Sequence, residues 1–216
     1  MGGNRANGHA HPEPGSFCAA QMCGAADTLR EQGYMVEISD LYAMNWGAAL
    51  DRADFMHPLE GQFKPQAEQV RAAKEGSFAP DVAAELEKLQ AADLLVFSSL
   101  LWWFSLAALL KGWVDRVFTM GTVYGGGVGT YDTGLFRGRR ALLTTGGVVE
   151  HYGPNARDGE MNVNLFHIQN GMLRFTVLAP VISYSLVRLT REDRAAQLGR
   201  VRGAFETLDE REVASG

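Results

Sequence analysis

A polar turn leads directly into a helix near the start of the chain, and this arrangement could bind phosphate. The turn reads His11-Pro12-Glu13-Pro14-Gly15, and Ser16 is placed to cap a helix expected over residues 16–32. The first N–H groups of a helix lack partners within it and lie at the positive end of its dipole. Such ends bind phosphate groups, but every helix has one, so this segment alone does not establish a site.

A cluster of aromatic residues follows the most apolar stretch of the chain. Residues 94–101 form an apolar run broken by two serines, which is typical of a central parallel strand, and Leu101-Trp102-Trp103-Phe104 stands at its end. Neighbouring side chains of a strand point to opposite faces, so these rings cannot all enter one core. They could hold a planar ring ligand or form an interface with another subunit, and the sequence leaves both open.

A third stretch, Thr144-Thr145-Gly146-Gly147, follows the next predicted strand at 141–145. Paired glycines let the backbone approach a ligand closely, although a tight turn uses them equally often. Ligands of doubly wound α/β sheets bind outside the carboxyl ends of the strands. Taken together, the three stretches therefore predict a ligand site at that edge of a sheet.

Other motifs that could carry chemistry are incomplete. Gly125-Gly126-Gly127-Val128-Gly129-Thr130 looks like a dinucleotide loop, but it follows a helix and lacks the full glycine spacing. The five histidines make no recognised zinc pattern. A serine flanked by glycines, as in a nucleophile elbow, is missing from the sequence. We expect no metal site.

The elements that must position these residues alternate between helix and strand, which favours an α/β domain with a doubly wound parallel sheet and helices on both faces. Residues 45–80 are irregular and rich in aromatic residues and prolines, which indicates a loop-rich embellishment. No repeat or linker divides the chain, so we expect a single domain over 1–216. Helices are expected at 16–32, 82–92, 105–118, 161–175 and from 190 onward, and strands at 35–41, 94–101, 141–145 and 177–184.

The composition is that of a globular enzyme and excludes several classes of partner. The net charge of −5 with scattered Lys and Arg argues against a nucleic-acid partner. No apolar run approaches the roughly 18 residues of a membrane span, and the polar start is unlike a signal peptide. Cys18 and Cys23 cannot make a disulfide framework and are expected to be reduced thiols. A cytoplasmic protein without membrane insertion is expected.

These motifs, in this order, resemble the NAD(P)H dehydrogenase (quinone) family of flavodoxin-like, two-electron quinone reductases. The resemblance runs from about Ala10 to Phe175 and weakens toward the C-terminus. Besides the three stretches above, it rests on Lys74-Glu75-Gly76, Ala79-Pro80-Asp81, Leu110-Lys111-Gly112-Trp113, Tyr131-Asp132-Thr133-Gly134 and Gly159-Glu160-Met161-Asn162-Val163.

The resemblance implies a five-stranded flavodoxin-like sheet and tightly bound FAD, in preference to FMN, acting as a hydride relay. It places four residues, His11, Ser16, Phe17 and Cys18, at the FAD diphosphate. It places the isoalloxazine ring against Leu101-Trp102-Trp103-Phe104 and Thr144-Thr145-Gly146-Gly147. NADH or NADPH and the quinone would then use one pocket in turn, with ping-pong kinetics, at a homodimer interface.

The resemblance also implies roles in catalysis and substrate binding. Tyr152 matches a family tyrosine whose hydroxyl stabilises charge on the reduced flavin or the substrate. Asp158 stands where vertebrate members carry a histidine, and it could accept a proton or face solvent. Tyr124 matches a residue that lines the substrate pocket. The sequence distinguishes neither NADH from NADPH nor the physiological acceptor.

One departure and two alternative functions accompany this interpretation. The family has a buried apolar strand before His11, but residues 2–9 are polar, so the first strand, at about 3–10, is atypical and an altered reading frame would explain it. An azo- or nitro-compound reductase would use the same flavin chemistry. A non-catalytic relative would instead be a regulatory subunit of a potassium efflux system, although the long 45–80 segment favours a reductase.

Overall fold

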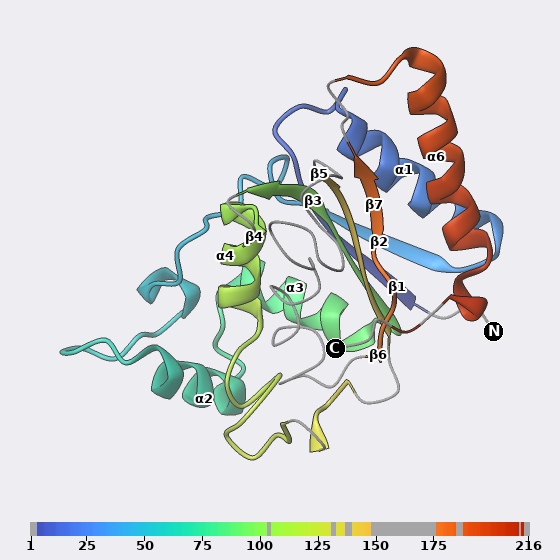
Figure 1. Cartoon of the computed structure of the whole chain (residues 1–216). Helices are drawn as coiled ribbons and strands as arrows, with labels where there is room; N and C mark the ends of the chain where they lie inside the picture. Colours follow the sequence, from blue (N-terminus) through green and yellow to red (C-terminus); the bar gives the residue numbers. More distant parts are fainter. Residues whose placement is uncertain are drawn as a thin grey trace, which may run out of the picture.

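A parallel sheet lies between two layers of helices in the computed structural model (Figure 1). The structure describes residues 4–102, 105–130, 133–136, 140–147, 176–184, 188–211 and 213. The strands are β1 (Asn4–Ala10), β2 (Met35–Asp40), β3 (Leu94–Trp102), β4 (Ser105–Leu106), β5 (Arg140–Gly147), β6 (Thr176–Val177) and β7 (Val181–Tyr184). The helices are α1 (Phe17–Glu31), α2 (Pro65–Glu75), α3 (Pro80–Ala91), α4 (Ala108–Val117) and α6 (Arg191–Glu206). Two short 3-10 helices are η1 (Arg52–Asp54) and η5 (Leu208–Glu210). The predicted fold class is confirmed.

The strand order is β2-β1-β3-β5-β6, with β7 also paired to β5 and β4 paired to β3. The expected strand count of five is therefore wrong for the described residues, which form seven strands. The expected last strand, at 177–184, is divided into β6 and β7, and Pro180, which has no N–H to donate to a ladder, lies in the gap. Residues 105–106 form β4, an antiparallel partner of β3, so the helix expected from 105 begins at Ala108.

The polar first strand occupies a central position. β1 pairs in parallel with β2 on one side and with β3 on the other, so both edges of its backbone are hydrogen-bonded. Gly8 leaves room for α4, because a Cβ at Gly8 would lie 3.3 Å from Leu110 Cδ1. The predicted position of the atypical strand is thus confirmed, and the polar sequence itself forms it.

Two cores lie on opposite faces of the sheet, because successive side chains of β3 alternate between them. Leu95 and Phe97 pack on the side of α3 and α4. Leu94 and Val96 pack on the side of α1 and α6, together with Phe205. Burial of these side chains contributes about 1.5–3 kcal/mol each, which holds the helices against the sheet and orients the loops at its edge.

Local signals in the sequence begin and end the helices. Ser16 Oγ accepts the Ala19 N–H at 3.1 Å at the start of α1, and Gly33 follows its end with a φ of 86°. Thr190 and Asp193 form the predicted capping box of α6. The two cysteines of α1 face differently, since Cys18 is buried and Cys23 is exposed. No helix of the described residues is long and apolar enough to cross a membrane.

The expected embellishment at 45–80 contains η1 and α2 and is tied to α4 by hydrogen bonds of the buried Arg116 side chain. Arg116 of α4 donates to Asp54 at 2.8 Å, to Asp81 at 2.8 Å and to the Gly47 carbonyl at 3.1 Å. Its guanidinium lies 4.1 Å from the ring centroid of Trp46. This network holds the segment on the face opposite α1 and α6.

Candidate functional site

The carboxyl ends of β1, β3 and β5 lie side by side, as the sequence predicts. Ala10 is paired with Ser99, and Ser99 is paired with Thr145. Leu100 is paired with Gly146 in the same register. The segments after these three strands therefore emerge at one edge of the sheet, where ligands of such folds bind.

The turn after β1 is held by its own hydrogen bonds and leads to the free N–H groups at the start of α1. Glu13 organises it, since its carbonyl accepts the Ser16 N–H at 3.0 Å and its Oε1 accepts the Gly15 N–H at 3.1 Å. Ser16 uses its own hydroxyl on Ala19. Within the described part of the chain, no acceptor reaches the N–H groups of Phe17 and Cys18. These two donors stand at the positive end of α1, which suits an anion.

His11 begins this turn with a defined hydrogen-bonding role. Its Nδ1 accepts the backbone N–H of Glu13 at 3.1 Å. The same Nδ1 lies 3.2 Å from the Glu13 carbonyl oxygen, to which it donates in the other tautomer. Nδ1 is therefore engaged within the turn in either tautomer, and Nε2 of the half-buried ring is left for a ligand outside it.

The aromatic cluster begins on β3 and leaves at least one ring in solvent. Trp102 is 61% exposed although it lies on a strand that pairs with β4. This agrees with the prediction that the rings cannot all enter the core. Of its neighbours, Leu101 is described by its backbone alone, and Trp103 and Phe104 lie outside the described residues.

The glycine pair lies at the carboxyl end of β5, next to the end of β3. Thr144, Thr145, Gly146 and Gly147 form the last four residues of that strand, described by their backbone, and Gly146 and Gly147 pair with Ser183 and Tyr184 of β7. Because β3 and β7 hold the two sides of this segment, its backbone is rigidly placed next to the end of β3.

Two buried polar residues at this edge were not predicted from the sequence. His9 is 2% exposed and its Nδ1 has no hydrogen-bond partner among the described residues, nor has the hydroxyl of buried Ser99. Burial lowers the pKa of His9, against the opposing effect of Asp40. The two serines that interrupt the apolar β3 sequence were the available signal, since buried polar groups need partners.

One predicted residue, Tyr124, is described and is not brought together with this edge. Tyr124 lies in the loop after α4, where Met120 N–H donates to Gln69 Oε1 of α2 at 3.0 Å. That loop lies at the opposite end of α4 from the end of β3 (Figure 1). Tyr152 and Asp158 lie outside the described residues.

A family model and curated relatives match most of the chain. Residues 8–206 match a family described by a flavodoxin-like fold. NAD(P)H dehydrogenase [quinone] 1 of Rattus norvegicus is 39% identical over 206 residues, which cover 92% of this chain and 75% of the relative. The chain belongs to the NAD(P)H dehydrogenase (quinone) family. Human ribosyldihydronicotinamide dehydrogenase [quinone] is 37% identical over 207 residues, covering 93% of this chain and 89% of the relative.

Solved structures of quinone reductases share the arrangement. The solved structure of a Klebsiella pneumoniae protein, provisionally named a quinone reductase, has a TM-score of 0.89 at 36% sequence identity. The match covers 97% of this chain and 86% of the Klebsiella chain. The NAD(P)H:quinone oxidoreductase of Methanothermobacter marburgensis has a TM-score of 0.71 at 25% identity, covering 97% and 98%. These similarities cover nearly the whole chain, so its fold is that of the two solved structures.

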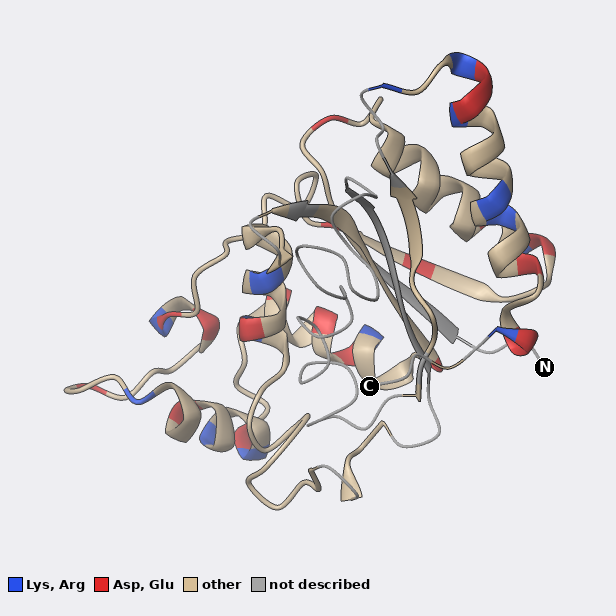
Figure 2. Ribbon diagram, in the orientation of Figure 1, with Lys and Arg blue, Asp and Glu red and all other residues tan. Residues whose placement is uncertain are grey.

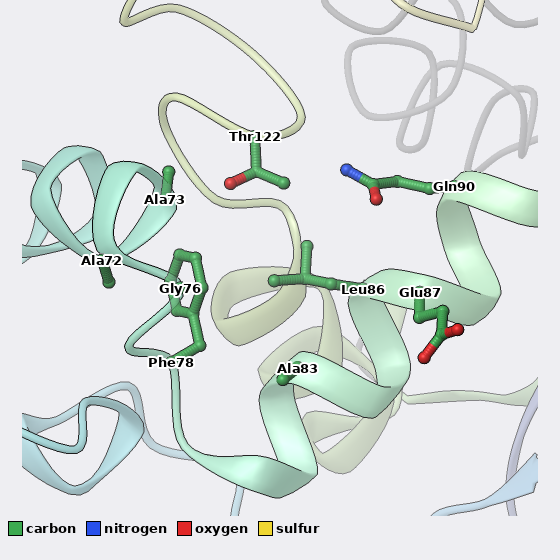
Figure 3. Close-up of a pocket in the computed structure, with 9 residues that line it drawn as sticks. All are labelled: Ala72, Ala73, Gly76, Phe78, Ala83, Leu86, Glu87, Gln90 and Thr122. Carbon is green, nitrogen blue, oxygen red and sulfur yellow. The ribbon is translucent and has the colours of Figure 1, made fainter.

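A separate cavity of about 210 Å³ lies between α2 and α3, away from this edge (Figure 3). Phe78 and Leu86 form much of its wall, and Thr122 faces it from the loop after α4. None of the predicted site residues is among the described residues that line this cavity.

Proposed function

We propose that the chain is a flavin-dependent NAD(P)H:quinone oxidoreductase whose cofactor is FAD in preference to FMN. The observation that carries this is the convergence of the α1 N-terminus with the ends of β3 and β5 in a member of this family. The class of the acceptor, a quinone, follows from the family.

The turn after β1 fits the diphosphate of such a cofactor. Phe17 and Cys18 offer backbone N–H groups, and His11, whose Nδ1 is engaged with the Glu13 backbone, offers Nε2. Glu13 is the acidic residue of the turn, and it directs its Oε1 to the Gly15 N–H. A donor set of this kind, at the positive end of a helix, binds phosphate oxygens without a lysine or arginine.

The ends of β3 and β5 fit a planar ring. Trp102 offers an exposed aromatic face, and the backbone of Gly146 and Gly147 allows close approach. We assign Trp103 and Phe104 to the same ring contact. A bound flavin would accept a hydride from NAD(P)H and deliver it to a quinone.

The chain's own residues would orient the reactants and stabilise charge. Tyr152 is assigned as the hydroxyl donor to developing negative charge, and Asp158 as the proton acceptor beside it. Tyr124 is remote from this edge within one chain, so its assignment to the substrate pocket requires a second copy. Several exposed apolar residues support such a homodimer, namely Tyr42, Met44, Met56 and Leu59. We place this enzyme in the cytoplasm.

The visible absorption spectrum of the purified protein tests the function first. Flavin bands that bleach when NADPH or NADH is added without oxygen, and return when a quinone is added, would establish the activity. Acid release and chromatography of the cofactor then distinguish FAD from FMN, and light scattering gives the oligomeric state. A protein that stays colourless with FAD supplied would contradict the proposal, and turnover of azo dyes without turnover of quinones would assign a different acceptor.

A further inference from the structure

A second cavity lies at the β7 edge of the sheet, between that strand and α6. It has a volume of about 210 Å³. Its lining comes from the β7 segment and from one side of α6, with one residue from beyond η5. The lining residues are Pro180, Val181, Ile182, Ser183, Gln197, Arg200, Val201, Ala204 and Arg211. None of the predicted flavin-site residues is among them, and the function proposed above does not use this cavity.

The polar side chains of the cavity have their acceptor atoms already occupied. Gln21 donates its amide to Ser183 Oγ at 2.7 Å, and Ser183 is buried. Arg200 donates from Nη2 to Gln197 Oε1 at 2.8 Å. A hydroxyl that accepts keeps its own proton, and an amide whose oxygen is occupied keeps its N–H₂ group. Ser183 and Gln197 are therefore left with donors.

The described residues that line the cavity carry charges of one sign. Their ionised side chains are those of Arg200 and Arg211, and none of them is acidic. Arg211 also satisfies acceptors of the wall, since it donates to the carbonyls of Ala179 at 2.6 Å and Pro180 at 2.9 Å. The charge of Arg200 and the donors of Ser183 and Gln197 therefore favour a ligand with acceptors and negative charge, since a guanidinium group matches the planar or tetrahedral oxygens of carboxylates and phosphates.

We propose that this cavity binds a small oxyanion, namely a free phosphate or carboxylate or the corresponding group of a metabolite, with Arg200 and Ser183 as its principal ligands. Pockets for larger organic ligands measure about 300–1,000 Å³, so the volume of this cavity suits an ion of a few heavy atoms. The site is separate from the N-terminus of α1, where a flavin diphosphate would bind.

Calorimetric titration of the flavin-saturated protein with inorganic phosphate, and separately with succinate, tests the proposal at constant ionic strength. We expect saturable binding of at least one anion to one site per chain. Arg200→Gln should weaken it about tenfold or more, since a charged hydrogen bond is lost. Arg191→Gln removes the same charge from the same helix outside the cavity and should leave the affinity within about twofold of the wild-type value. Ser16→Ala perturbs the α1 N-terminus and should leave anion binding intact, which separates this site from the flavin site.

The results have distinct meanings. Preference for phosphate identifies a phosphate group as the natural ligand, and preference for succinate identifies a carboxylate. Failure of both anions to bind, or equal losses in the Arg200 and Arg191 variants, would overturn the proposal. Loss of anion binding with Ser16→Ala alone would show that the ion occupies the flavin site instead. Because none of these measurements uses turnover, the proposal stands or falls independently of the quinone reductase activity.

Discussion

Arg116 of α4 donates from Nε to Oδ1 of Asp54 at 2.8 Å, and both side chains are buried. The other oxygen of Asp54 has no hydrogen-bond partner among the described residues. Burial raises the pKa of Asp54, and the hydrogen bond and charge of Arg116 oppose that rise. Arg116 therefore favours the charged form of Asp54 against the effect of burial, and this pair joins the loop 45–80 to α4.

Arg116→Met should destabilise the protein by about 3–5 kcal/mol at pH 7.5, because it leaves a buried carboxylate without its cation. Removing the cation raises the pKa of Asp54 further, so a proton can neutralise the group as the pH falls. The deficit relative to wild type should accordingly shrink between pH 7.5 and pH 5. Urea unfolding at the two pH values measures both effects.

Lys111→Met is the matched control for this variant. Lys111 lies on the same helix and pairs with Asp115 at 2.5 Å, but both side chains are about half exposed. Exposed pairs contribute about 0–1 kcal/mol. Equal losses in the two variants would show that the Arg116–Asp54 pair does not stabilise the fold beyond an ordinary surface ion pair.

Sequence patterns predicted α1, α3, α4, α6, β2, β3 and β5, but neither α2 nor β4, and the helix expected at 161–175 lies outside the described residues. The tertiary contacts of these elements did not follow from the patterns. Capping residues predicted the helix ends, namely Ser16, Gly33 and Thr190. The alternation of apolar and polar residues over 35–41 predicted the edge strand β2. The partner of Arg116 could not be predicted, because Asp54 is 62 residues distant in the chain and carboxylates occur throughout it. The sequence of β1 (Asn4–Ala10) also gave little indication of a strand, because its side chains are polar. Hydrogen bonds to β2 and β3 on its two edges form this strand, and they depend on tertiary structure.

For the candidate site, too, sequence patterns predicted the backbone arrangement but not the side-chain contacts. Strand ends and glycines predicted that the three segments would meet at one edge of the sheet, because parallel strands bring their carboxyl ends together. The unpartnered atoms of His9 and Ser99 depend on how the neighbouring strands pack, so the sequence could not reveal them.

Gly112→Ala should destabilise the protein by about 1–3 kcal/mol, as overpacking does. A Cβ at this position would lie 2.3 Å from the Ala48 carbonyl oxygen, so α4 and the loop at 48 would have to separate. Gly199→Ala is the control, since no atom lies within 4 Å of its Cβ position in α6. There alanine should stabilise by about 0.5–1 kcal/mol through helix propensity alone. Thermal unfolding of both variants gives the comparison, and a stabilised Gly112→Ala would disprove the close approach.

His9 should make folding sensitive to acid. Burial lowers its pKa in the folded protein below the ordinary value of 6.5, an effect that His11 reinforces, whereas Asp40 and a hydrogen bond with the Ser98 backbone oppose it. The unfolded chain therefore binds the proton more readily, so stability is present above about pH 6.5 and is lost as the pH falls. His9→Leu should lose less stability than wild type between pH 7.5 and pH 5.5.

Urea unfolding at both pH values measures this difference. The control, His57→Asn, removes an exposed histidine from the loop before α2 and should follow the wild-type pH dependence. If His9→Leu and wild type lose stability in parallel, His9 is not held neutral in the folded protein.

Ser16→Ala should separate cofactor binding from helix stability. Both Ser16 and Thr190 are N-caps, with hydroxyls that accept from Ala19 N–H and Asp193 N–H at 3.1 Å each. Loss of either cap should cost about 1 kcal/mol in the free energy of unfolding. Ser16 alone borders the turn proposed to hold the flavin diphosphate, so Ser16→Ala should also weaken flavin affinity about tenfold, whereas Thr190→Ala should leave it unchanged. Flavin fluorescence during titration of the apoprotein measures that affinity, and equal flavin binding by the two variants would remove Ser16 from the cofactor site.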